Sequence, residues 1–119
     1  MGTKRRYRIS GAEEIKLLFI KGRRIESPLF RIIFRKNVFP HARFLFVTPK
    51  AIEKRATARN RIRRRTREWL YRSSLLQHSL DVAFIFKKDA IVSPRKFFYE
   101  ELSRKTAILS SGTDRHSAS

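Results

Sequence analysis

The sequence predicts one small α/β domain, an α+β sandwich of element order α-β-β-α-β-α in which helices pack on a small sheet. The chain has 119 residues, of which 41% are hydrophobic and ten are Phe, and this is enough for one core. Three short apolar runs have the length of strands, and segments with helical periodicity lie before, between and after them. No internal repeat or domain boundary is visible, so residues 1–109 are expected to form a single domain.

The first expected helix follows a short basic arm, Met1–Tyr7. Ser10–Glu13 has the form of a capping box, in which the serine caps the helix and the glutamate reaches back to it. Gly22 is a natural helix stop. The helix is therefore expected between these two features, with apolar side chains on one face and part of a second.

Three apolar segments are expected to form the strands. Ser27–Arg35 has Pro28 near its start, where a strand tolerates proline. After a turn at 37–41, Arg43–Thr48 is apolar on both faces, as in a sheet that is covered on both sides. Asp81–Lys87 is the third apolar strand.

A helix rich in arginine is expected between the second and third strands. Seven arginines and no acid lie between Arg55 and Arg67. Thr57 is the expected cap, and the helix is expected to run to about Ser73. At about 100° per residue, one side is an apolar stripe and the other a basic face. The stripe consists of Ala58, Ile62, Thr66, Trp69 and Leu70, and the basic face of Asn60, Arg61, Arg63, Arg64 and Arg67.

The C-terminal part is expected to be a helix followed by a tail. Ser93-Pro94 is a cap followed by a proline in the first helical turn. The helix that it opens is expected to end near Thr106. The Ser-rich segment 110–119 is expected to be disordered.

The net charge restricts the function more than any other property. Lys and Arg number 29 against 10 for Asp and Glu, which gives +19 and a pI near 11.6. A domain this small carries such self-repulsion when a polyanion neutralises it, and a nucleic acid is the usual partner. The arginine face suits this partner, because a guanidinium binds two phosphate oxygens at once and stacks on bases. A merely solvated face would mix the two signs of charge, so that alternative is weak.

The composition also excludes several classes. Without cysteine there are no disulfides, cysteine nucleophiles or Cys-type zinc sites. No apolar run approaches the roughly 20 residues of a membrane span, so no membrane partner is expected. The basic N-terminus lacks the hydrophobic stretch of a secretory signal, so the cytoplasm is the expected compartment.

No group of side chains predicts catalysis by the protein alone. His41, His78 and His116 lie far apart in the sequence and are interpreted as solvated polar residues. The acidic residues never form a metal-binding pattern, and four glycines could hardly build a phosphate loop. The protein is therefore not expected to be a hydrolase or nuclease through its own side chains.

Two features have alternative interpretations. Asn60 either satisfies backbone donors in the first helical turn or contacts RNA, directly or through water around a bound cation. Phe19 and Ile15, with an apolar strand face, form either a stacking surface for single-stranded bases or part of the core. Spacing alone favours the core.

The motif Arg59-Asn60-Arg61 is continued by further arginines in the segment A-R-N-R-I-R-R-R-T-R-E. In this position between two strands, and in a chain of this size, it resembles the R-N-R helix of the protein subunit of bacterial ribonuclease P. The Phe-x-x-Gly helix end at Phe19–Gly22, the third strand and the final helix agree with that family in order. The resemblance covers about Tyr7 to Leu109.

The resemblance implies a left-handed β-α-β crossover through the arginine helix, against the usual right-handed rule. It implies an endoribonuclease whose chemistry belongs to the RNA subunit, which uses Mg²⁺ to remove the 5′ leader from precursor tRNA. The protein would bind that RNA, grip the leader between the first helix and the sheet, and raise the affinity for metal ions. No residue of the chain is expected to be catalytic or a certain metal ligand, although Asn60 is a candidate for an indirect metal contact.

The site residues that the resemblance implies fall into two groups. The RNA-binding group lies on the arginine helix and the connector before it, and consists of Arg59, Asn60, Arg61, Arg63, Arg64 and Arg67 with Arg55 and Lys50. The leader cleft has Ile15 and Phe19 on the first helix and Ile33 on the facing strand.

The chain departs from the family pattern in several places. Family members often have Ser-Lys-Lys where Thr48–Lys50 stands and lysine where Ala58 stands. They often have aromatic residues where Ile15 and Ile33 stand. Leader stacking is therefore expected to depend mainly on Phe19, and leader contacts to be weaker than is usual in the family.

Two other functions are compatible with the charge. A ribosomal or other structural RNA-binding protein would bind RNA without a role in tRNA cleavage. A DNA-binding protein would lay the arginine helix in the major groove, but no second helix at a tight turn precedes it, as a helix-turn-helix requires. DNA is therefore not an expected partner.

Overall fold

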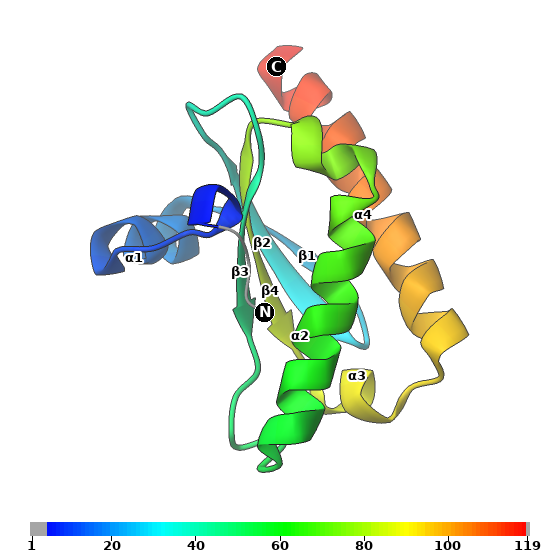
Figure 1. Cartoon of the computed structure of the whole chain (residues 1–119). Helices are drawn as coiled ribbons and strands as arrows, with labels where there is room; N and C mark the ends of the chain where they lie inside the picture. Colours follow the sequence, from blue (N-terminus) through cyan, green and yellow to red (C-terminus); the bar gives the residue numbers. More distant parts are fainter. Residues whose placement is uncertain (1–4, 119) are drawn as a thin grey trace.

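The computed structural model describes residues 5–118, with side chains for residues 5–109, and has a four-stranded sheet with helices on both faces (Figure 1). The predicted α+β architecture is confirmed. The elements are η1 (Arg5–Tyr7), α1 (Ala12–Lys21), β1 (Arg23–Glu26), β2 (Phe30–Lys36), β3 (Arg43–Val47), α2 (Ala56–Tyr71), η2 (Ser74–Gln77), β4 (Leu80–Phe86), α3 (Lys88–Val92) and α4 (Arg95–Ala118).

The strands lie in the order β1-β2-β4-β3. β2 pairs antiparallel with β1 and with β4, whereas β3 and β4 are parallel neighbours joined through α2. This is the predicted β-α-β crossover, and its left-handed sense stays a prediction. The crossover places α2 against the sheet and leaves its opposite side to solvent.

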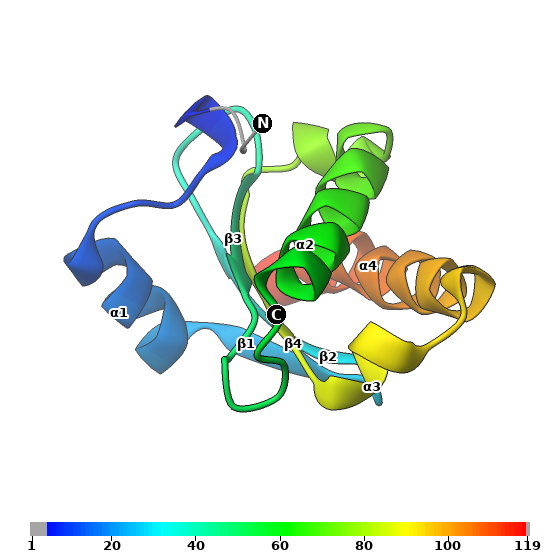
Figure 2. The same cartoon turned by 60° about the horizontal axis from the view of Figure 1, so that its bottom comes forward.

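The main core lies between the sheet and the pair α2 and α4 (Figure 2). Five phenylalanines are almost completely buried, and neighbouring rings among them contact each other edge-on or stacked. They are Phe30, Phe44, Phe84, Phe86 and Phe98. Phe84 and Phe86 of β4 face the same core because a β-strand turns every second side chain to the same face.

A second, smaller core lies under α1 on the other face of the sheet. Leu18 of α1 packs there with Ile33 and Ala83 of the sheet and with Ile9, and all four are buried. Helix α1 ends at Lys21, and Gly22 caps it by donating its N–H to Leu18 O at 2.8 Å. The predicted helix stop at Gly22 is therefore confirmed. Both faces of the sheet are covered, as the apolar pattern of β3 predicted.

Several boundaries differ from the sequence prediction. The capping box at Ser10–Glu13 is wrong, because Gly11 occupies the cap with φ 96° and the helix start has no side-chain cap bond. Arg55, not Thr57, precedes the first residue of α2, and the helix ends at Tyr71. β1 was not predicted, because Arg23–Glu26 has one apolar residue and its strand conformation depends on pairing with β2.

The C-terminal region also differs. A short helix, α3, precedes α4, and α4 continues past Thr106 to Ala118, whereas a disordered tail was predicted for 110–119. No proline lies in this stretch to end the helix. The side chains beyond Leu109 lie outside the described residues.

The outer edge of β3 is covered by the N-terminal segment. Arg8 forms an isolated parallel bridge with Phe44, and Ile9 N–H donates to Phe44 O at 3.1 Å. The opposite edge strand, β1, has charged side chains at three of its four positions.

Candidate nucleic-acid interface

Helix α2 is attached to the core by one narrow stripe. Ala58, Ile62, Thr66 and Leu70 are buried and recur every four residues, so the predicted stripe is confirmed, with Trp69 half-buried beside it. The buried hydroxyl of Thr66 donates to Ile62 O at 2.8 Å and so remains satisfied. This stripe fixes the rotation of the helix, and therefore the direction of every arginine on it.

The arginines of α2 flank this stripe and cover the side opposite to it. On a helix of about 100° per residue, Arg61 and Arg65 lie on one flank, while Arg59, Arg63 and Arg67 lie on the other. Asn60 and Arg64 lie farthest from the core, and both are exposed. The six residues predicted on this helix therefore occupy a broad band of positions rather than one row.

Asn60 is engaged by a neighbouring arginine. Its side-chain oxygen accepts a hydrogen bond from Arg63, one turn further along α2. It does not cap the helix, so the interpretation that it satisfies backbone donors in the first turn is wrong. The bond holds the Arg63 guanidinium beside the exposed amide.

The connector before α2 has an internal ion pair. Glu53 accepts from Arg55 Nε at 2.8 Å and from its backbone N–H at 2.9 Å. These hydrogen bonds, with the nearby charge of Arg59, lower the pKa of Glu53 to about 2. Arg55 is thus partly neutralised within the protein, whereas Lys50 is exposed in a turn.

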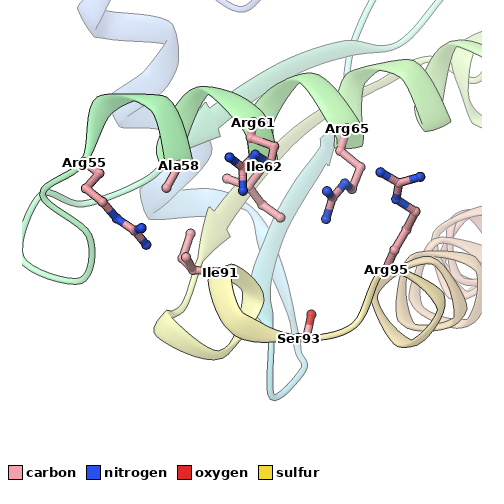
Figure 3. A pocket seen from close by; sticks show the side chains of 8 residues that line it. All are labelled: Arg55, Ala58, Arg61, Ile62, Arg65, Ile91, Ser93 and Arg95. Atoms are coloured by element: carbon pink, nitrogen blue, oxygen red, sulfur yellow. The ribbon is translucent and has the colours of Figure 1, made fainter.

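A basic cavity separates α2 from α3 and the start of α4 (Figure 3). Its volume is about 330 Å³, and an adjoining cavity of about 420 Å³ shares three of its arginines. The shared residues are Arg61, Arg65 and Arg95. Arg65 and Arg95 were not among the predicted site residues, and Arg95 lies too far along the chain for any local pattern to connect it with α2.

The predicted leader residues lie on the α1 side of the sheet. Ile15 and Phe19 are half-buried and pack against the small core under α1, as do Leu45 of β3 and Ile85 of β4. Ile33 has only 1% of its surface exposed and is covered by α1, so it does not offer a contact surface in this conformation. Among the strand residues that pack against this small core, Leu45 and Ile85 are partly exposed, and the sequence alone did not identify them.

An ion-pair network attaches the start of α1 to the sheet. The Arg43 guanidinium donates to Asp81 through Nε at 2.9 Å and through a terminal nitrogen at 2.8 Å, and to Glu14 of α1 at 2.7 Å. The hydrogen bond to Asp81 is the main cause that raises the pKa of Arg43, and the bond to Glu14 adds to it, so Arg43 remains charged. The same guanidinium lies 4.5 Å from the centre of the Phe39 ring.

Among the side chains of residues 5–109, no group of three or more His, Asp or Glu is arranged to hold a metal ion. No helix in this part of the chain is both long and apolar enough to cross a bilayer.

Comparisons with known proteins agree with this geometry. The family model for Ribonuclease P matches residues 3–109, which include α1, the sheet and α2. The chain is 38% identical over 89 residues to the ribonuclease P protein component of Aliivibrio salmonicida, covering 72% of this chain and 74% of that protein. The corresponding Thermotoga maritima protein is 30% identical over 101 residues, covering 84% and 79%.

Solved structures show the same fold. The RNase P protein of Staphylococcus aureus matches with a TM-score of 0.75 at 22% identity, covering 87% of this chain and 94% of that one. The RNase P protein from Thermotoga maritima matches with a TM-score of 0.64 at 26% identity, covering 71% and 77%.

Proposed function

Since the chain belongs to the ribonuclease P protein family, we propose that α2 binds the RNA subunit of that enzyme and that the α1 side of the sheet binds the 5′ leader of precursor tRNA. As a member of this family, the chain is the protein component of ribonuclease P, a ribonucleoprotein endoribonuclease that acts in tRNA 5′ processing. Its partner in the holoenzyme is RNA.

The observation that carries the first half of the proposal is the attachment of α2. One buried stripe holds the helix, so its six arginines project from a rigid element instead of a mobile loop. Guanidinium groups bind phosphate oxygens in pairs and retain their charge, so a fixed band of them matches the backbone of a folded RNA. The residues that we propose for this face are Arg59, Asn60, Arg61, Arg63, Arg64 and Arg67, with Arg55 and Lys50 at its start.

The second half rests on the half-buried apolar side chains beside α1. Phe19 and Ile15 pack against the same small core as Leu45 and Ile85, which gives an aromatic ring beside an apolar core that is still partly open to solvent. Unpaired bases stack on such rings with little dependence on sequence. Arg35, exposed on the same face of β2 as Ile33, supplies positive charge for the backbone of a single strand.

The metal ions of the reaction are Mg²⁺ ions bound at the active site of the RNA. Mg²⁺ usually keeps several waters and binds a few anionic oxygens, so phosphates of the RNA suit it. The protein acts on these ions by bringing positive charge and positioned RNA close to them, with Asn60 as a candidate for a water-mediated contact. The holoenzyme works in the cytoplasm.

The test is cleavage of precursor tRNA by a bacterial ribonuclease P RNA at low Mg²⁺, with and without the protein. Stimulation by the wild type, no cleavage by the protein alone, and weakened RNA binding by the double variant Arg61→Ala, Arg64→Ala are expected. The affinity of the wild type should fall steeply with salt, because each phosphate contact releases counterions. Tight RNA binding without stimulation would instead indicate a ribosomal or other structural RNA-binding protein, an alternative that none of the relatives described above supports.

A further inference from the structure

The cavity between α2 and the start of α4 is formed by two helices that are distant in the sequence. Arg61 and Arg65, four residues apart on α2, point toward α3 and α4, and Arg95 points back toward α2 from the start of α4 (Figure 3). Ala58, Ile62 and Ile91 add apolar side chains to the lining, and Ser93 and Arg55 complete it, the latter already paired with Glu53. The arginines therefore face a common space from two rigid elements.

Of the four arginines that line this space, only Arg55 is paired with a carboxylate among the described side chains. Within residues 5–109, none of Arg61, Arg65 and Arg95 forms a hydrogen bond or ion pair with a carboxylate. Glu68 lines the adjoining cavity but makes no ion pair with them. Three guanidinium groups that share one cavity repel each other, and a bound anion would relieve that repulsion.

The start of α4 adds to the positive potential. The 24-residue helix has no acidic residue in its first turn, and the N-terminus of a helix carries partial positive charge. Ser93 places a hydroxyl on the same wall of the cavity, where it donates only a long hydrogen bond of 3.4 Å to Ala90 O. Planar guanidinium forks, a hydroxyl and a helix N-terminus are the groups that proteins use to bind a phosphate.

We propose that the cavity between α2 and α4 is a phosphate-binding site, in which Arg65 and Arg95 act with Arg61 on one phosphate group. The inference rests on the proposed function, since the RNA bound by α2 supplies such a group in its backbone. The RNA contact then extends beyond the outer surface of α2, and α4 takes part in it. A free phosphate ion has the same chemistry, so the test separates the two sources.

The first arm measures binding to the ribonuclease P RNA for Arg65→Gln, Arg95→Gln and the double variant. Lys96→Gln is the matched control, because it removes one charge from the neighbouring exposed position, which lines neither cavity. Each single variant should weaken binding about tenfold and reduce the slope of log K against log salt by about one, as expected for one lost charged contact to phosphate. The control should change affinity less than about twofold.

The double variant tests whether the two arginines share a ligand. Residues that act on the same group are not additive, so the double variant should lose clearly less than the roughly hundredfold product of the singles. Additive losses would mean two separate contacts and would overturn the shared site.

The second arm measures calorimetric binding of inorganic phosphate to the wild type and to Arg65→Gln. Binding by the wild type that the variant loses supports the site with free phosphate as a sufficient ligand. If no ion binds while the RNA arm gives its expected result, the RNA backbone is the source.

The inference is overturned if Arg65→Gln and Arg95→Gln bind RNA as Lys96→Gln does and inorganic phosphate does not bind. If Arg61→Ala, Arg64→Ala still weakens RNA binding in that case, the proposed function stands and only the cavity site fails. If that double variant also binds normally, the proposed role of α2 fails with it.

Discussion

Replacing Gly22 by alanine should disturb the packing of α1 on the sheet and lower the stability of the protein. Gly22 has an ordinary backbone conformation, with φ −70°, so its importance comes from space and not from strain. A Cβ atom there would lie 2.6 Å from Ile33 Cγ2 and even closer to the backbone oxygen of Leu18. Leu18 and Ile33 are both 1% exposed, so neither has free space to move into.

The expected cost of Gly22→Ala follows from this crowding. Overpacking of a closed core costs about 1–3 kcal/mol, and two obstructed neighbours place this variant near the upper end, at about 2–3 kcal/mol. For a chain of this size that corresponds to a Tm lower by roughly 8–12 °C. Gly11→Ala is the comparison: Gly11 has φ 96°, and an added Cβ would make only an ordinary contact of 3.7 Å with Glu14 Oε2, so backbone strain alone should cost about 1 kcal/mol.

Urea unfolding followed by circular dichroism measures both variants, and RNA binding adds a second readout. Because α1 carries Phe19, Gly22→Ala should reduce the preference for precursor over mature tRNA while the affinity for the RNA subunit, bound through α2, stays near the wild-type value. A destabilisation below about 0.5 kcal/mol would show that the close contact between the end of α1 and β2 is not rigid, and would refute the reasoning.

Three other results are expected. Phe19→Ala should lower the ratio of precursor to mature tRNA affinity by roughly 5- to 100-fold, the value of one base stacked on an aromatic ring; an unchanged ratio would remove Phe19 from the leader surface. Arg43→Met should destabilise the protein by about 2–3 kcal/mol in urea unfolding, because Asp81 remains largely buried without its guanidinium partner; a loss below about 1 kcal/mol would contradict this. The lowered pKa of Glu53, caused first by hydrogen bonds from Arg55, means that its stabilisation is present above pH 4.5 and is lost as the pH falls toward 2. The urea midpoints of wild type and Glu53→Gln should therefore differ at pH 5 and converge near pH 2, and a constant gap would argue against the assignment.

Local patterns in the sequence were sufficient for the elements that carry strong periodicity. The stripe of Ala58, Ile62, Thr66 and Leu70 predicted both the helix and its buried side, because residues four apart lie on one face of a helix, whereas a strand has a period of two. β1 could not be predicted in this way. Only Ile25 in it is apolar, and its conformation is imposed by hydrogen bonds to β2.

The candidate site was predictable where it follows one helix and not where it joins several elements. Ile33, Leu45 and Ile85 share one face of the sheet, as their alternation indicates, but the position of α1 decides which of them is covered. Arg65 and Arg95 are 30 residues apart in sequence, and only the packing of α4 beside α2 brings them to one cavity. No spacing rule connects such a pair.

The bridge between Arg8 and Phe44 bears on how the protein behaves at high concentration. β3 is an edge strand that is apolar on both faces, and an uncovered edge of this kind pairs readily with another molecule. The segment at Arg8 and Ile9 occupies part of that edge. Removing the chain as far as Ile9 would therefore expose a template for intermolecular β-pairing and favour aggregation, so these residues protect solubility as well as contributing positive charge.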